Sequence, residues 1–301
     1  MAKTSIRPNI FAVGDAKCGT TSLHKMFLLS PKIGVSTVKE LHYFSHPELL
    51  ERVNGPGDDA IARNVVRSEA DYLAKFAALD PGLPAVADIS PSYIRYPAAA
   101  LRIRDFAPEA KIVIMLREPA AKVFSQYVHM WSKGRETLPF DQALAATAER
   151  RAAGWSDMYD YEGGGRYAEV VRAYLDVFGR DRVLVLLFEE LIAAFPAEKA
   201  RLERFLGVEI PLAAFPQANP SGRIRSPLAA ALVENQTLRR LRTALVPPAL
   251  RARLSLAARS RLAIDKPTLD PDLRTALRRG FAEDVAALEE VLGRPTGWPR
   301  A

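Results

Sequence analysis

A loop near the start of the chain combines glycines, a lysine and hydroxyl groups in an order that suits an anion site. It reads Gly14-Asp15-Ala16-Lys17-Cys18-Gly19-Thr20-Thr21-Ser22. An apolar run over residues 9–13, predicted as a buried parallel strand, precedes it, and a helical pattern over residues 22–29 follows. In a strand–loop–helix unit the backbone N–H groups converge at the helix N-terminus, where anions bind. The loop therefore predicts a phosphate site, although a glycine turn with a solvated lysine would share this sequence.

The position of the lysine separates this loop from the phosphate loop of kinases and nucleoside triphosphatases. In those enzymes the lysine directly follows the second glycine, and the next Ser or Thr holds Mg²⁺. Here Thr20 follows Gly19, and Lys17 precedes that glycine by two positions. This order indicates a grip on one phosphate and one adjacent leaving-group oxygen, with no demand for a metal. A P-loop-type small-molecule kinase or phosphotransferase is the alternative, with Asp88 as a loosely matching magnesium ligand.

Three further segments carry motifs that match one family in the same order as the loop. They are Lys39-Glu40-Leu41-His42-Tyr43-Phe44, Asp88-Ile89-Ser90-Pro91-Ser92-Tyr93, and Arg117-Glu118-Pro119 followed by Ser125 and Tyr127. With the loop, these segments resemble the sulfotransferases that use 3′-phosphoadenosine-5′-phosphosulfate (PAPS), in their bacterial and heparan-sulfate-type branch. Weaker similarity continues through residues 165–167 and 188–191, so the resemblance covers essentially the whole chain.

The resemblance implies PAPS as co-substrate, adenosine 3′,5′-bisphosphate as product, and no metal. Arg117 directly follows a predicted strand, at the sheet edge where α/β ligands bind, and its guanidinium suits a 3′-phosphate that Ser125 also contacts. A surface ion pair with Glu118 is the alternative. Arg223 or Arg225 completes this clamp, unless both are solvated loop residues. The expected donor-binding residues are Lys17, Cys18, Gly19, Thr20, Thr21, Ser22, Arg117, Ser125 and Arg223.

Three residues are expected to act in catalysis: Lys17, Glu40 and His42. Sulfuryl transfer, like phosphoryl transfer, depends on positioning and charge stabilisation, so Lys17 would neutralise the leaving 5′-phosphate during in-line displacement. Glu40, which the resemblance also marks, would be the general base for the acceptor hydroxyl or amine, or would only pair with Lys39. His42 lies on the same face if the segment is extended, and is the competing base or a structural hydrogen-bonding residue. Lys39 either contacts the sulfuryl group or is solvated.

Two departures from the family pattern concern the acceptor. The Glu-Lys pair before the Pro-x-Tyr motif is Asp88-Ile89 here, so a lysine that helps some relatives to bind sugars is absent. A Lys-Gly-Phe element that closes over the donor has no match, and residues 219–223 stand in its place. A glycosaminoglycan acceptor is therefore in doubt. A sugar, a lipid or a natural product all stay open.

Strand and helix patterns alternate along the first two thirds of the chain. This alternation predicts an α/β fold, with a central parallel β-sheet flanked by helices on both faces and a P-loop-like phosphosulfate-binding loop. We expect one sulfotransferase domain over residues 1–301, of which 226–301 form a helical C-terminal extension, and a surface loop over 51–63. The predicted strands are 9–13, 85–89, 111–116 and 182–188, and the predicted helices are 22–29, 69–79, 98–106, 120–131, 167–178 and 197–206.

Charge is concentrated in one segment of the 301-residue chain, whose formal net charge is +7. Residues 223–266 carry ten Arg or Lys against two acids, without interleaved aromatic residues, which argues against nucleic acid as a partner. Leucines at helical spacing in this segment indicate helices with one apolar face and one basic face. The apolar face packs on the core with the basic face in solvent, or the helices make peripheral contact with a membrane. A single cysteine and no recognisable signal peptide predict a cytoplasmic location. Oligomeric state is not readable from these patterns.

Overall fold

A five-stranded parallel sheet forms the centre of the computed structural model, which describes residues 6–36, 38–216, 223–224, 263–264 and 267–300. The strand order is β2-β3-β1-β4-β5. Four of these strands confirm the predicted ones, whereas β2 was not predicted because three residues give too short an apolar run. The strands are β1 (Ile10–Gly14), β2 (Ile33–Val35), β3 (Ala85–Ile89), β4 (Lys111–Leu116) and β5 (Val183–Leu187).

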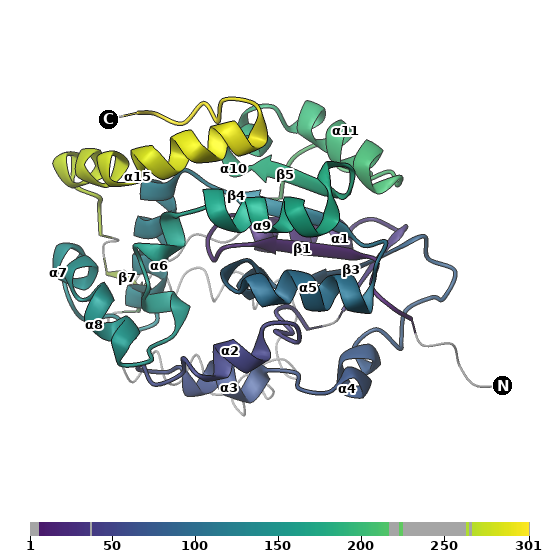
Figure 1. Cartoon of the computed structure of the whole chain (residues 1–301), viewed down its shortest axis with the longest axis horizontal. Helices are drawn as coiled ribbons and strands as arrows, with labels where there is room; N and C mark the ends of the chain where they lie inside the picture. Colours follow the sequence, from purple (N-terminus) through teal and green to yellow (C-terminus); the bar gives the residue numbers. More distant parts are fainter. Residues whose placement is uncertain (1–5, 37, 217–222, 225–262, 265–266, 301) are drawn as a thin grey trace.

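Helices connect the strands and cover both faces of the sheet (Figure 1). The longer ones are α1 (Thr20–Leu28), α5 (Pro97–Phe106), α6 (Pro119–Ser132), α9 (Ala168–Phe178), α11 (Phe195–Leu206) and α15 (Pro271–Leu292). The shorter ones are α2 (His46–Leu50), α3 (Asp59–Asn64), α4 (Glu69–Ala74), α7 (Phe140–Ala145), α8 (Thr147–Ala152) and α10 (Phe188–Ala193). Short 3₁₀ turns are η1 (Pro91–Arg95), η2 (Asp157–Tyr159), η3 (Gly163–Gly165) and η4 (Arg180–Arg182), and β6 (Arg223–Ile224) pairs antiparallel with β7 (Ala263–Ile264).

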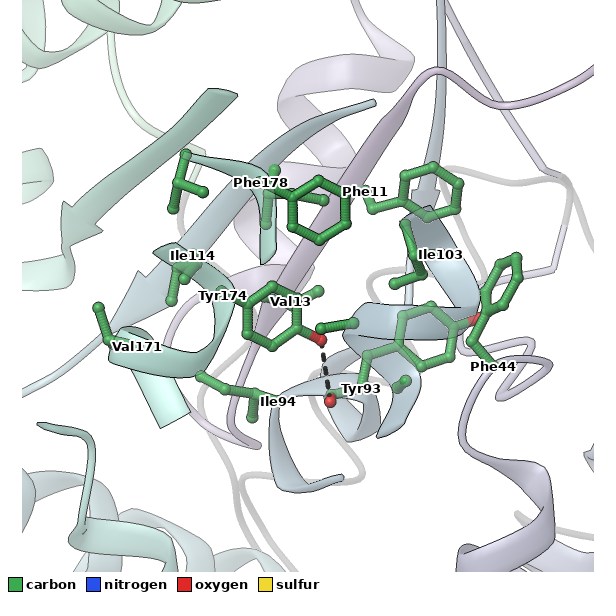
Figure 2. Packing of buried hydrophobic residues seen from close by; sticks show 14 of the residues in the cluster. Phe11, Val13, Phe44, Tyr93, Ile94, Ile103, Ile114, Val171, Tyr174 and Phe178 are labelled. Atoms are coloured by element: carbon green, nitrogen blue, oxygen red, sulfur yellow. Dashed lines mark hydrogen bonds between the residues drawn. The ribbon is translucent and has the colours of Figure 1, made fainter. Parts of the chain in front are cut away.

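Alternate residues of the central strands build two separate cores, one on each face of the sheet. Phe11 and Ile114 face α5, α9 and α15, where Tyr174 of α9 is fully enclosed. Figure 2 shows this side, with the Tyr174 hydroxyl donating to the Tyr93 carbonyl at 3.0 Å. Ala12 and Met115 face the other way, toward α1, α10 and α11. Both faces are thus covered, as an all-parallel sheet requires.

The sheet order places the loop of residues 14–22, here called the anion loop, at the middle of the sheet. β1 pairs with β3 on one side and β4 on the other, so the chain leaves β1 where the direction of winding reverses. Ligands of doubly wound sheets bind at such a switch point, outside the carboxyl ends of the strands. The segments that follow β1, β3 and β4 therefore meet there: the loop from Gly14, the residues after Ile89, and Arg117.

Several predicted boundaries were wrong. The segment expected as a loop over 51–63 contains α3, whose first turn begins at Asp59. α1 and α11 begin two residues earlier than predicted, and α4 ends at Ala74 rather than residue 79 because the chain turns there to enter β3. α15 confirms that the C-terminal region is helical, whereas the basic, leucine-containing stretch over 238–261 lies outside the described residues. Of the helices that the structure describes, none is long and apolar enough to span a membrane.

Candidate active site

A cavity of about 830 Å³ opens at the carboxyl edge of the sheet. The anion loop, α2, α3, α10 and η2 all contribute to its lining, and so do Lys39, Glu40 and His42. Lys17, Gly19, Thr20, Thr21, Ser22, Glu40, His42, Arg117 and Ser125, all expected site residues, line this one space.

Two glycines allow the loop to lie close to its neighbours. Gly14 has φ of 146° and Gly19 has φ of 97°, values that favour glycine. A Cβ at Gly14 would meet the Met115 carbonyl oxygen at 2.5 Å, and one at Gly19 would meet the Phe188 ring at 2.6 Å. The loop therefore packs directly on β4 and α10, and α1 starts at Thr20 with its N-terminus toward the cavity.

The Cys18 side chain lies behind the loop and does not line the cavity. It is fully buried, and its Sγ lies 3.9 Å from the Tyr167 hydroxyl. Burial raises the pKa of the Cys18 thiol to about 12. Any contact that Cys18 makes with a donor must therefore come from its backbone, which narrows the role expected from sequence.

Lys39 joins the loop to Glu40. Its ammonium donates to Thr21 Oγ1 at 3.0 Å, to Glu40 Oε1 at 2.9 Å and to Thr20 Oγ1 at 3.4 Å. The Glu40 side chain is 46% exposed, and the space that it faces is the cavity. Burial acts to raise the pKa of Glu40, but the neighbouring Lys39 ammonium outweighs it and holds the pKa below its ordinary value. Lys39 is thus an ion-pair partner within the site, and the solvated alternative was wrong.

His42 is held by a short chain of hydroxyl groups. Its Nδ1 lies 2.7 Å from Ser92 Oγ, which lies 2.8 Å from Ser45 Oγ. Burial lowers the pKa of His42 below its ordinary value, so the ring is neutral near pH 7. His42 and Glu40 would share a face on an extended segment, but both residues have left-handed backbone, with φ of 56° and 63°; both nevertheless line the cavity.

Arg117 contacts the anion loop and not its sequence neighbour. Its Nη1 donates to the Lys17 carbonyl at 3.2 Å, and its guanidinium lies 4.9 Å from the centre of the Phe188 ring. Glu118 instead pairs with Arg278 at 3.2 Å, so the alternative of an Arg117–Glu118 surface pair was wrong. Ser125 lies about two turns into α6 and faces the same cavity. Arg223 is placed in β6, but its side chain lies outside what the structure describes, as does Arg225.

His129 is a cavity residue that the sequence reasoning missed. It follows Ser125 by one helical turn on α6, so the same helix face brings it to the cavity. Burial and the nearby cations Lys17 and Lys133 lower the pKa of His129 to about 4. The four-residue spacing from Ser125 was the signal that could have identified it.

Asp88, the magnesium ligand of the kinase alternative, does not line the cavity. Its carboxylate is fully buried and accepts hydrogen bonds from Tyr72 at 2.9 Å, Tyr93 at 2.7 Å and Ser90 at 2.8 Å. Burial raises the pKa of Asp88 above its ordinary value. The residue anchors the turn after β3, which also carries Ser92.

Backbone strain is concentrated in the cavity. In the part of the chain that the structure describes, Lys17, Glu40 and His42 are the only residues other than glycine with φ in the left-handed region. Such conformations cost free energy and persist where the surroundings impose them, which is often at functional sites. All three residues were expected from sequence to act in catalysis.

Comparison with known proteins identifies the class. A model described as "Sulfotransferase family" matches residues 8–211, so the chain belongs to the sulfotransferase family and is a sulfotransferase enzyme, which excludes the kinase alternative. A solved sulfotransferase from Alicyclobacillus acidocaldarius is similar over 96% of this chain and 97% of that chain, at 34% identity and a TM-score of 0.75.

Two curated relatives have names that refer to carbohydrate or heparan sulfate. Carbohydrate sulfotransferase 15 of Mus musculus is 24% identical over 61% of this chain and 40% of its own length. Bifunctional heparan sulfate N-deacetylase/N-sulfotransferase 2 of Homo sapiens is 22% identical over 67% of this chain and 22% of its own. The chain thus spans less than half the length of these relatives.

Proposed function

We propose that this sulfotransferase moves the sulfuryl group of PAPS to an acceptor hydroxyl or amine by in-line displacement. The observation that carries the proposal is the convergence of Lys17, Glu40 and His42, each in left-handed backbone, on one cavity with Arg117 and Ser125. Each such conformation costs about 1–3 kcal/mol, and backbone strain of this kind clusters at functional sites. We infer that position relative to a reacting group is what these residues supply.

The donor would bind along the anion loop. Backbone N–H groups at the start of α1 and the hydroxyls of Thr20, Thr21 and Ser22 would hold the 5′-phosphosulfate, with Lys17 neutralising the charge that grows as the S–O bond breaks. Arg117 and Ser125 would hold the 3′-phosphate. Arg223 is proposed as a further phosphate contact on the grounds of its sequence alone. No step in this scheme needs a metal.

The acceptor proton would pass to Glu40. A carboxylate with a pKa below its ordinary value is ionised at neutral pH and can accept the proton as the acceptor attacks sulfur. Lys39 contacts both Glu40 and Thr21, so it would lie between the base and the donor and would also contact the sulfuryl oxygens. His42 would orient the acceptor through a neutral ring held by Ser92, and it is the second candidate for the base.

The acceptor is proposed only by class. The names of the curated relatives favour a carbohydrate, whereas the replacement of a Glu-Lys pair by Asp88-Ile89 argues against a glycosaminoglycan. Leu49, Ile61 and Met158 add apolar surface to the acceptor side of the cavity. We therefore propose a sugar, lipid or natural-product acceptor that presents a hydroxyl or amine beside an apolar body.

Calorimetric titration tests the donor. We expect adenosine 3′,5′-bisphosphate to bind in the micromolar range with or without Mg²⁺, and more tightly than ATP or AMP. Arg117→Ala should abolish this binding, whereas Arg104→Ala, which removes an exposed arginine on α5, should not change it. Tighter, Mg²⁺-dependent binding of ATP would refute the proposed donor.

Turnover tests the base. After a screen of acceptors with radiolabelled PAPS, Glu40→Gln should bind the bisphosphate as the parent does and lose turnover, because the amide cannot accept the proton. Unchanged turnover in Glu40→Gln with loss in His42→Gln would transfer the role of base to His42.

A further inference from the structure

A buried group of charges connects the anion loop to α6 and η1, and the proposed chemistry does not use it. Asp15 and Arg95 border the cavity, whereas Lys122 does not line it. Asp15 Oδ2 accepts a hydrogen bond from Lys122 Nζ at 2.6 Å and lies 2.9 Å from Arg95 Nε, while Asp15 Oδ1 accepts from the Ala16 N–H at 2.6 Å. Lys122 has no exposed surface, and Asp15 is almost fully buried. The second residue of the loop is therefore anchored to α6 and to η1.

The same group continues to the acceptor side of the cavity. Lys122 also donates to Gln126 Oε1 at 2.6 Å. Gln126 Nε2 in turn donates to the carbonyls of Asp157 and Met158, each at 3.0 Å, and both of these residues line the cavity. A continuous set of side-chain hydrogen bonds thus runs from Asp15 in the loop, along the buried face of α6, to η2 at the proposed acceptor side of the cavity.

Stability alone does not explain this arrangement. Removing an ammonium and a carboxylate from water costs free energy that their attraction often fails to recover, and well-packed apolar residues are frequently as stable or more so. Apolar side chains at Asp15 and Lys122 could fill the same volume. Apolar side chains could not fix the orientation of the loop relative to η2. Hydrogen bonds of defined geometry fix both orientations together.

The ion pairs around Asp15 keep its carboxylate charged. They connect four cations with three carboxylates in one network. Burial acts to raise the pKa of Asp15, but Arg95 and Lys122 outweigh it and hold the pKa below its ordinary value. The members are Arg52, Arg95, Lys122, Arg151, Asp15, Asp157 and Asp160.

We propose that Lys122 and Gln126 are positioning residues, which fix the donor loop relative to the acceptor wall through Asp15 and the carbonyls of η2. Neither side chain lines the cavity, so neither contacts the donor. The inference rests on the proposed function, because it takes the loop to be the donor site. It predicts that donor affinity depends on residues buried behind the loop.

The test is the affinity of adenosine 3′,5′-bisphosphate for variants of the full chain, measured by calorimetry with folding checked by circular dichroism. Lys122→Met should weaken binding by about 2- to 30-fold, the range for residues that act on a site without contacting the ligand. Arg150→Met is the matched control. It removes one cation from another buried pair, with Glu136 at 2.6 Å, and should lower the melting temperature without changing affinity.

A double variant separates positioning from stability. Asp15→Asn in the Lys122→Met background removes the carboxylate that Lys122 no longer contacts, while Arg95 keeps Asp160 at 3.8 Å, so the affinity should stay low whether or not the melting temperature recovers. Affinity that recovers together with stability would overturn the proposal. So would parent-like affinity in folded Lys122→Met.

Gln126→Leu provides a second route if Lys122→Met does not fold. It keeps every charge and removes only the link to η2, and we expect weaker binding of the bisphosphate here too. Unchanged affinity in folded Gln126→Leu would overturn the proposal. A parent chain that binds no bisphosphate at all would instead refute the proposed function, and this inference with it.

Discussion

Gly164 gives a direct test of how tightly the charges behind the donor loop are packed. It lies in η3, and its Cα faces the Lys122 ammonium. A Cβ there would lie 2.6 Å from Arg95 Nη2 and 3.0 Å from Asp15 Oδ2, and closer still to Lys122 Nζ. These atoms end flexible side chains, but each chain is held by ion pairs, so none can move without losing a partner.

The expected cost of Gly164→Ala follows from these contacts. An extra methyl group in a packed interior typically costs about 1–3 kcal/mol. If Lys122 is displaced from Asp15, breaking the buried pair adds up to about 3–5 kcal/mol. We therefore expect a loss in the free energy of unfolding of about 1–3 kcal/mol if the pair holds and of about 4–8 kcal/mol if it breaks. For a chain of this size about 2 °C of melting temperature corresponds to 1 kcal/mol, so the melting temperature should fall by at least about 2 °C and by about 8 °C or more if the pair breaks.

Urea denaturation and thermal melting followed by circular dichroism measure both quantities. Gly280→Ala is the control, because its Cβ would meet nothing within 4 Å and the residue lies inside α15. That change should stabilise the chain by about 0.4–1 kcal/mol through the lower entropy of the unfolded state. If Gly164→Ala proves as stable as the parent, the charges behind the loop are not rigidly packed and the reasoning fails.

Three further predictions concern the cavity and the loop that borders it. Lys17→Ala should lower turnover at least about 10²-fold, the effect of losing one preorganised donor, and a change of only a few-fold would refute its role. Cys18 should resist thiol reagents in the folded chain and react after denaturation, because burial raises its pKa to about 12; rapid labelling of the native chain would contradict this. The pKa of Glu40 lies below its ordinary 4.5, and a base acts when it is deprotonated. Turnover should therefore stay level as the pH falls from about 8 to about 5. A decline centred near 6.5 would instead indicate that an ordinary histidine is the base.

Sequence patterns predicted the sheet well where strands are apolar over their whole length. β4 reads Lys-Ile-Val-Ile-Met-Leu, and its bounds were predicted without error, because burial on both faces leaves no polar alternation. β2 has only three residues, Ile33–Val35, and its pairing with β3 decides that it is a strand. This pairing is a tertiary contact, which a short stretch of sequence does not reveal.

For the site, the spacing of residues along the chain predicted which residues belong to it better than it predicted their geometry. The order of lysine, glycine and hydroxyls in the loop singled out Lys17 and Thr20, which both line the cavity. It could not show that the Cys18 thiol turns inward to Tyr167, or that Glu40 has left-handed backbone. Lys122 looked like one more helix lysine, since its partner Asp15 is 107 positions away.

The register of β1 has a consequence for how the molecule forms. Ile10 pairs with Ala87 on one side and with Lys111 on the other, and Gly14 pairs with Met115. During synthesis β1 must therefore wait for about a hundred further residues before both of its neighbours exist. Such long-range pairing folds slowly and leaves an apolar strand exposed in the meantime. Because the loop that begins at Gly14 rests on β4, a nascent chain forms the proposed donor site only after the centre of the sheet has closed.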